Sequence, residues 1–274
     1  MYIVMVTPEI APAAKIGGLA DMVIGLAREL QAVGHTVEII APLYQCLRWD
    51  QVQDVKDAYA ELWVPRWDKW QAEKVVEGLV SGVKTYFVSG GQYTARERIY
   101  GFDDDIFRFS YFCRAALEFM YKANKRPEIL HCHDWTTALV PVLYYEMFNA
   151  LGWNNSRCVF TIHNTECQGL CWYGDKVFSL VGLNPAALWK PDRLRDDHHP
   201  NCIHLMRGGI VYSNFVTTVS PSYAGDIKTA GGGRGLDRVL GAHAGKLGGI
   251  INGIDYDAWN PGTDGKISQT YTAE

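Results

Sequence analysis

The sequence has no long apolar run and no excess of charge of one sign. None of its hydrophobic stretches approaches the roughly 20 residues that a membrane-spanning helix needs, so we expect no membrane partner. Its 26 basic and 30 acidic residues give a net charge of −4, which gives no reason to expect nucleic acid as a partner. Met1 and Tyr2 already begin an apolar strand pattern, so we also expect no signal peptide.

The seven cysteines lack the even number and the close pairing of a secreted disulfide scaffold. Several lie within apolar patterns, which indicates buried, reduced thiols in a cytosol-like compartment. Cys167 and Cys171 have no second close pair, while His131 and His133 fall on the same face of a predicted strand. A zinc site built from these four residues is the less favoured alternative, and we expect no metal.

Strand patterns alternate with helix patterns along most of the chain. The strand patterns are short β-branched runs without polar alternation, which is typical of strands buried on both faces of a parallel sheet. We expect strands at Tyr2–Val6, Thr36–Ala41, Ala60–Val64, Val83–Val88, Ile129–His133, Cys158–His163, Phe215–Val219 and Gly248–Ile251. We expect helices at Leu19–Val33, Phe107–Lys122, Thr136–Ala150, Leu205–Ser213 and Pro221–Thr229. This order predicts an α/β fold with a Rossmann-like, doubly wound and mainly parallel sheet.

Other segments depart from this alternation. Ala60–Val88 is rich in strand residues and suggests a small hairpin attached to the sheet. Asp192–Pro200 is polar and is expected to be an exposed loop, and Gly231–Gly235 a flexible one. From Trp259 onward the sequence has turn residues and no core pattern, so we interpret it as a linker.

The segment from Lys15 to Asp21, Lys-Ile-Gly-Gly-Leu-Ala-Asp, lies between the first predicted strand and the first predicted helix. Backbone N–H groups at such a helix N-terminus face an anion. Gly17 and Gly18 carry no Cβ to obstruct a ligand, and Lys15 adds a positive charge suited to phosphate. A tight turn with a solvated lysine is the structural alternative.

Polar clusters follow the predicted strands at their carboxyl ends, where ligands bind in doubly wound sheets. The clusters are Glu9 with Lys15, His131 to Trp135, His163-Asn164 with Glu166 and Gln168, and Ser220 to Tyr223. For Ser220 a helix N-cap is the favoured interpretation, and Asp134 could also be an N-cap. A basic glycine loop beside a carboxylate, a histidine and an amide predicts a polar ligand that carries phosphate.

Taken together, these motifs resemble those of a known family. The segment from Lys15 to Asp21 is similar to the Lys-x-Gly-Gly-Leu-(Gly or Ala)-Asp signature of bacterial glycogen synthases and of plant or cyanobacterial starch synthases. The resemblance covers essentially the whole chain, and Ala20 is most like the starch synthase III and IV branch. Further matching motifs, in chain order, are Tyr100-Gly101, Arg108-Phe109, Ala115 to Glu118, His131 to Trp135, Phe160 to Asn164, Gln168-Gly169, Arg207 to Ile210, Thr217 to Tyr223, Gly248 to Asp255 and Trp259 to Pro261.

The resemblance implies a glycosyltransferase with two Rossmann-like domains, the GT-B architecture. Such enzymes transfer glucose, with retention of configuration, from ADP-glucose to the non-reducing end of an α-1,4-glucan or maltooligosaccharide. It assigns His163, Asp134 and Asn164 to the sugar subsite as catalytic residues. The residues that it assigns to substrate binding are Lys15, Gly17, Gly18, Glu9, Asp21 and, more loosely, Tyr100.

The resemblance implies no cofactor beyond the donor substrate and no metal. Asp103 to Asp105 is the nearest acidic run, and we expect it to cap a helix at Ile106. No nucleophile is assigned, because a front-face mechanism is usual in this family. The family also suggests the bacterial cytosol, or the plastid stroma after removal of a transit peptide.

The resemblance implies that residues 1–258 are the N-terminal, acceptor-side domain and residues 259–274 the start of the interdomain linker. We therefore expect an N-terminal fragment with half of an active site, a C-terminal nucleotide-binding domain as its missing partner, and little activity alone. Residues facing that domain, notably Glu9, Lys15, His163 and Ser222, should be exposed along one edge. Two alternatives remain open: a glucan- or partner-binding module without transfer, and a GT-B enzyme with another nucleotide sugar.

Overall fold

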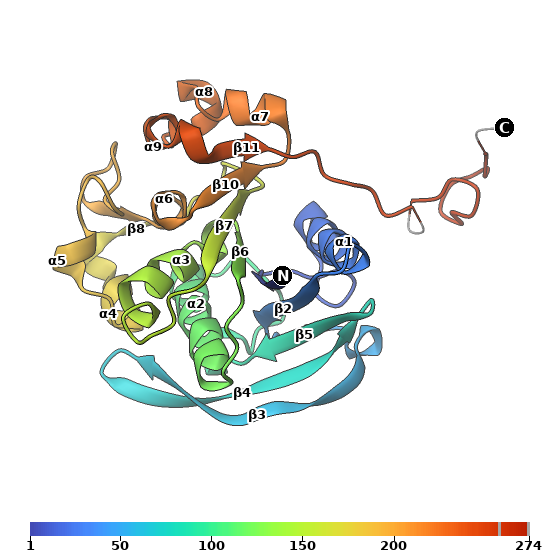
Figure 1. Cartoon of the computed structure of the whole chain (residues 1–274), viewed down its shortest axis with the longest axis horizontal. Helices are drawn as coiled ribbons and strands as arrows, with labels where there is room; N and C mark the ends of the chain where they lie inside the picture. The colour runs from blue at the N-terminus through green and yellow to red at the C-terminus, as the bar shows by residue number, and fades with distance from the viewer. Residues whose placement is uncertain (257–258, 273–274) are drawn as a thin grey trace.

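The computed structural model describes residues 1–256 and 259–272. Within that part of the chain, no helix is long and apolar enough to cross a membrane. The predicted boundary between residues 258 and 259 adjoins residues 257 and 258, which lie outside the described residues, and it stays a prediction. After the last strand, residues 250–256 and 259–272 form neither helix nor strand and lie to one side of the sheet (Figure 1).

The core of the described chain is a nine-stranded sheet with the order β11-β10-β7-β6-β1-β2-β5-β4-β3. Every pairing from β11 to β5 is parallel, and β4 and β3 add an antiparallel edge. A separate antiparallel pair is formed by β8 (Leu170–Trp172) and β9 (Cys202–His204). The strands of the large sheet are β1 (Tyr2–Val6), β2 (Thr36–Pro42), β3 (Gln53–Arg66), β4 (Lys69–Val80), β5 (Val83–Val88), β6 (Ile129–His133), β7 (Arg157–Ile162), β10 (Phe215–Thr218) and β11 (Leu247–Gly249).

Helices cover both faces of the parallel part of the sheet, so the predicted doubly wound fold is confirmed (Figure 1). Alternate residues of β1 divide between two cores: Ile3 and Met5 pack with α1, and Val4 and Val6 pack with α2 and α3. The helices are α1 (Gly18–Ala32), α2 (Asp105–Lys122), α3 (Leu139–Leu143), α4 (Val177–Val181), α5 (Pro185–Leu188), α6 (Leu205–Tyr212), α7 (Pro221–Asp226), α8 (Ala230–Gly233) and α9 (Asp237–Ala242).

The predicted hairpin is present, but its first strand is longer than the strand expected at Ala60–Val64. It comprises β3 and β4, and β4 was missing from the sequence-based prediction. Polar residues alternate along β4 because one face of this antiparallel edge is solvated. The turn after β3 also lacks a typical turn sequence, since Trp67 rather than glycine adopts a positive φ of 57°.

Three other expectations need correction. The helix predicted at Thr136–Ala150 is divided into a short 3₁₀ turn, α3 and a π-helical segment, and Pro141 within α3 has no N–H to donate. The flexible loop predicted at Gly231–Gly235 begins as α8, because the Thr229 hydroxyl accepts the Gly232 N–H and caps it. The loop predicted to be exposed at Asp192–Pro200 contains a buried Leu194 and a buried Asp196.

Candidate functional site

The candidate site lies where the order of the parallel strands reverses. Chain order runs outward from β1 through β2 to β5 on one side and from β6 through β7 to β10 on the other. Crevices beyond the carboxyl ends of the strands at such a switch point bind ligands in open α/β sheets. Glu9, Asp134 and His163 follow β1, β6 and β7, so the sheet brings these predicted site residues to one edge.

The predicted glycine loop forms the N-terminus of α1, with Gly17 as the N-cap and no side-chain cap. Two of its N–H groups are already satisfied: Glu9 Oε2 accepts the Ile16 N–H at 2.6 Å and the Gly17 N–H at 2.9 Å. A Cβ on Gly17 or Gly18 would meet no atom within 4 Å. The space above both glycines is therefore open, and the first N–H groups of α1 have no acceptor within the helix.

Lys15 and Asp21 lie together beside this helix terminus. Lys15 Nζ donates to Asp21 at 2.7 Å, and the two side chains are 42% and 37% exposed. An ion pair in water is a weak contact. Lys15 is thus held near the loop by a carboxylate that a stronger anion can replace.

Glu9 differs from the expectation that it would be exposed, since it is only 4% exposed. Its Oε1 accepts the Tyr100 hydroxyl at 2.8 Å, while its Oε2 holds the glycine loop. Burial and the Glu9 charge raise the pKa of Tyr100 well above its ordinary value, so the phenol keeps its proton. Glu9 therefore joins two segments of the site.

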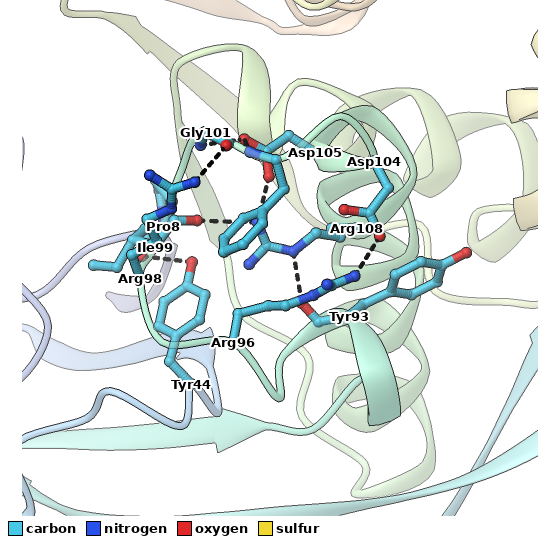
Figure 2. A network of polar contacts seen from close by, with 11 residues as sticks. Pro8, Tyr44, Tyr93, Arg96, Arg98, Ile99, Gly101, Asp104, Asp105 and Arg108 are labelled. Carbon is cyan, nitrogen blue, oxygen red and sulfur yellow. Dashed lines mark hydrogen bonds and ion pairs between the residues drawn. The ribbon is translucent and has the colours of Figure 1, made fainter.

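The segment that carries Tyr100 is held by buried Arg108 on α2 (Figure 2). Arg108 donates from Nε to the Tyr93 carbonyl at 2.7 Å and from Nη1 to the Ile99 carbonyl at 3.2 Å, and it pairs with Asp105. Asp105 also accepts the Gly101 N–H at 2.8 Å. Arg108 and Gly101, which lie in two separate sequence motifs, are thus joined through Asp105.

The acidic run before α2 was expected to cap the helix. Asp104 is at the N-cap position but makes no cap hydrogen bond, and Arg96 donates to its carboxylate at 2.6 Å. Asp105 instead binds backbone N–H groups that precede it. In the part of the chain that the structure describes, no group of three or more His, Cys, Asp or Glu could hold a metal ion.

Asp134 has an unusual backbone conformation for a residue other than glycine, with φ 55° and ψ −178°. Its N–H donates to the Thr161 carbonyl, and its Oδ1 accepts the His163 N–H at 2.7 Å. It therefore links β6 to β7 rather than capping the following turn, where it makes no cap hydrogen bond. Strain of this kind is concentrated at functional sites.

Burial raises the pKa of Asp134 to about 7, and the nearby Glu9 charge adds to this shift. The backbone N–H groups of His163 and Asn164 oppose the shift, because they favour the charged form. The side chain is half-buried, and near neutral pH it exchanges between an acid and a carboxylate.

Three histidine rings pack against one another in tilted pairs near Asp134. The ring centroids of His131 and His133 are 4.2 Å apart, those of His133 and His163 are 5.5 Å apart, and His133 Nδ1 lies 3.3 Å from His163 Nε2. Burial lowers the pKa of His163 to about 4 and that of His131 to about 3, and it lowers the pKa of His133 well below its ordinary value. All three rings are therefore neutral at pH 7.

His133 is the residue that sequence reasoning undervalued. Its same-face spacing with His131 was recognised, but only as a possible zinc ligand pair. The spacing places both imidazoles on one face of β6, where the two rings pack against each other at a tilt of 41°. The position of His133, two residues after His131 and directly before Asp134, is the sequence pattern that could have marked it as a site residue.

Asn164 and Ser222 lie at the rim of the site. Asn164 is exposed, and its Oδ1 accepts the Glu166 N–H at 2.8 Å. Ser222 is exposed as expected, and Ser220 caps α7 by accepting the Tyr223 N–H. Lys15 is likewise exposed, whereas His163 is half-buried and Glu9 is buried, so the expected exposure along this edge holds for Lys15 and Ser222 alone.

Comparison with known proteins then identifies the family. The model of the starch synthase catalytic domain matches residues 2–242. The chain belongs to this family. Curated relatives include glycogen synthase 2 of Methylococcus capsulatus, 51% identical over 96% of this chain, and glycogen synthase 1 of Nitrosococcus oceani, 47% identical over 99%.

Solved structures agree with the family. The catalytic domain of starch synthase IV from Arabidopsis thaliana, bound to ADP and acarbose, is 41% identical and superposes with a TM-score of 0.93 over 98% of this chain. The predicted resemblance to the glycogen and starch synthase family is thus confirmed, and it includes a structural match to a starch synthase IV. Sucrose-phosphate synthase from Thermosynechococcus elongatus, at 15% identity and a TM-score of 0.51, shares the fold alone.

The chain spans about half the length of the proteins that it matches, namely 54% and 55% of the two glycogen synthases and 55% of the starch synthase IV chain. The family assignment therefore concerns the region that aligns.

Proposed function

We propose that the protein containing this chain transfers glucose from ADP-glucose to the non-reducing end of an α-1,4-glucan, with retention of configuration. The observation that supports the proposal most strongly is the polar cluster at the switch point of a sheet that belongs to the starch synthase family. A related structure, 41% identical, binds ADP and the oligosaccharide acarbose. Both ligands have the chemistry expected of the donor and the acceptor.

In the proposed donor site, positively charged and N–H groups would bind the diphosphate. Lys15 and the open N-terminus of α1 would bind the diphosphate, whose departure needs positive charge and N–H donors. Asp21 would release Lys15 when the phosphates arrive, since its contact with Lys15 is exposed. We propose no metal and no cofactor, and Lys15 with the Gly17-Gly18 loop would do this work.

The proposed sugar site is formed by His163, Asn164 and Asp134. A neutral His163 suits hydrogen bonding to a sugar hydroxyl, because burial keeps its pKa at about 4. Asp134 would hold the His163 backbone in position and face the developing positive charge of the sugar as a carboxylate. Glu9 and Tyr100 would act on the substrate mainly through the loop that they hold.

The direct test uses the full product of the reading frame that encodes this chain. It is incubated with a labelled maltooligosaccharide and either ADP-glucose or UDP-glucose, and chain extension and anomeric configuration are measured. We expect extension with retention, and faster extension from ADP-glucose. Extension from neither donor, with the glucan still bound, would support a glucan-binding module instead.

The alternative with another nucleotide sugar has its own outcome in this assay. The likeness to sucrose-phosphate synthase concerns only the fold and gives no reason to prefer UDP-glucose. A clear preference for UDP-glucose would refute the proposed donor. The chain of 274 residues is assayed in parallel, and we propose that it is nearly inactive alone because a cleft needs groups from both walls in register.

A further inference from the structure

His133 lies next to the proposed sugar site but is not among the residues proposed to bind the substrate. It is completely buried at the end of β6, and its Nδ1 lies 3.3 Å from His163 Nε2. Two neutral imidazoles can share such a contact in only one way: one ring nitrogen donates its single N–H and the other accepts with its lone pair. The direction of this hydrogen bond therefore determines the tautomers of both rings.

The other ring nitrogen of His133, Nε2, determines which of the two rings donates this hydrogen bond. His133 Nε2 is buried and has no hydrogen-bond partner in the described part of the protein. A buried N–H without an acceptor carries the full free-energy penalty of its desolvation. An unprotonated imidazole nitrogen leaves only a lone pair without a hydrogen bond, which costs less. The proton of His133 therefore belongs on Nδ1, where it has an acceptor.

His163 must then accept at Nε2 and carry its own proton on Nδ1. No described residue forms a hydrogen bond with His163 Nδ1 that would oppose this arrangement. We propose that His133 is a positioning residue that holds His163 as the Nδ1–H tautomer and so gives the sugar site an N–H donor. This inference rests on the proposed function of His163.

The surroundings of His133 support this role. His131 packs against the His133 ring with centroids 4.2 Å apart, and Thr161 holds His131 Nε2 at 2.7 Å. The Thr137 hydroxyl accepts the backbone N–H of His133 at 2.6 Å. The next residue, Asp134, binds the backbone N–H of His163. Two consecutive residues of the chain thus hold His163, one through its ring and one through its backbone.

The test needs no enzymatic activity, because NMR reports histidine tautomers directly. The chain is labelled with ¹⁵N-histidine, and long-range ¹H–¹⁵N spectra are recorded near neutral pH. The His163 signals are assigned by their loss in His163→Gln, and the His133 signals by their loss in His133→Phe. We expect both rings to be protonated on Nδ1. Protonation of either ring on Nε2 in the unsubstituted chain would overturn the proposal.

The variants test whether His133 is the cause. In His133→Phe the ring remains but the donor is lost, so we expect His163 to change to the Nε2–H form. In His133→Asn an amide N–H replaces Nδ1–H, so we expect His163 to stay protonated on Nδ1. An unchanged His163 tautomer in folded His133→Phe would overturn the proposal. If that variant does not fold, Nε2 protonation in His133→Asn has the same meaning.

A kinetic measurement separates this inference from the proposed function. In the full transferase, we expect His133→Phe to lower kcat by about 10- to 100-fold, because a group misplaced by about 1 Å can cost 100-fold. The KM for ADP-glucose should change by less than about 3-fold, and His133→Asn should recover part of the loss. An unchanged kcat in His133→Phe would refute the positioning role. If the unsubstituted protein transfers no glucose, the proposed function fails while the tautomer result stands.

Discussion

The two halves of the candidate site are built in opposite ways. The glycine-loop half contains Lys15 and Asp21, which are charged, exposed and joined by an ion pair in water. The histidine half contains His131 and His133, which are neutral and buried, and the strained Asp134. One half can exchange its partners, whereas the other is held from several directions.

The difference follows from the chemistry that each half would serve. In the proposed function, a diphosphate brings its own negative charge and would replace Asp21 as the partner of Lys15. A sugar is neutral and offers only hydroxyl groups, so selecting it requires donors and acceptors with fixed directions. Directions are maintained best where side chains are buried and packed. The comparison predicts that substitutions in the two halves have different signatures.

Replacing His163 should give the largest effect. In the full transferase, His163→Ala should lower kcat by about 100- to 1000-fold, since removing one positioned hydrogen-bond donor at a reacting centre costs this much. The KM for ADP-glucose should change little, because the diphosphate contacts remain. Steady-state kinetics with purified, folded variant provide the measurement. A full kcat would mean that His163 is simply a packed residue at the end of β7.

Replacing Lys15 should give a smaller effect of another kind. One charge-assisted phosphate contact is worth roughly 1.5–3 kcal/mol, so Lys15→Ala should raise the KM for ADP-glucose by about 10- to 100-fold. The matched control is Lys69→Ala, an exposed lysine at the start of β4 and outside the site. If both variants behave alike, Lys15 does not contact the donor.

The sequence predicted the fixed framework better than the contacts within it. The largely buried runs Val83–Val88 and Ile129–His133 match β5 and β6 residue for residue, because a strand covered on both faces lacks the regular polar alternation of a half-exposed strand. The strand β4, which lies between β5 and the edge strand β3, was missed because its pattern mixes polar and apolar residues.

The site residues show the same limit. Parallel strand ends must meet at one edge, so the meeting of Glu9, Asp134 and His163 could be predicted. The orientation of their side chains could not, because each depends on partners distant in the chain. Glu9 turns inward to Ile16, Gly17 and Tyr100, and Asp134 binds a backbone N–H 29 residues later instead of capping its own turn.

The protonation of Asp134 offers a test of the buried half through stability. Its pKa is about 7 in the folded chain and near 3.8 when unfolded, so the folded state binds more protons between these values. The stabilisation that the protonated Asp134 side chain gives the folded state is therefore present at low pH and is lost as the pH rises to about 7. Relative to the unsubstituted chain, Asp134→Asn should gain on the order of 1–3 kcal/mol in unfolding free energy between about pH 4.5 and pH 8.

Urea unfolding at several pH values measures this difference. Asn keeps an oxygen for the His163 N–H and tolerates a positive φ, so any offset that does not depend on pH is expected to be small. Asp57→Asn, on the exposed part of β3, is the control and should show no trend. A stability difference for Asp134→Asn that does not vary with pH would place the Asp134 pKa near its ordinary value.

The smallest expected effect is that of Lys15→Ala on stability, and it distinguishes the two halves of the site most clearly. Lys15→Ala should change the unfolding free energy of the chain by less than about 0.5 kcal/mol, because exposed ion pairs contribute little to stability. Asp21 keeps a favourable position in the first turn of α1, where a negative charge faces the positive end of the helix, even without Lys15. Urea unfolding at low and high salt provides the measurement. A lysine that contributes nothing to folding but strongly affects donor affinity would belong to the exchangeable half of the site. A loss above about 1.5 kcal/mol would instead make Lys15 part of the structural framework, since the contact would then exceed what an exposed pair can supply.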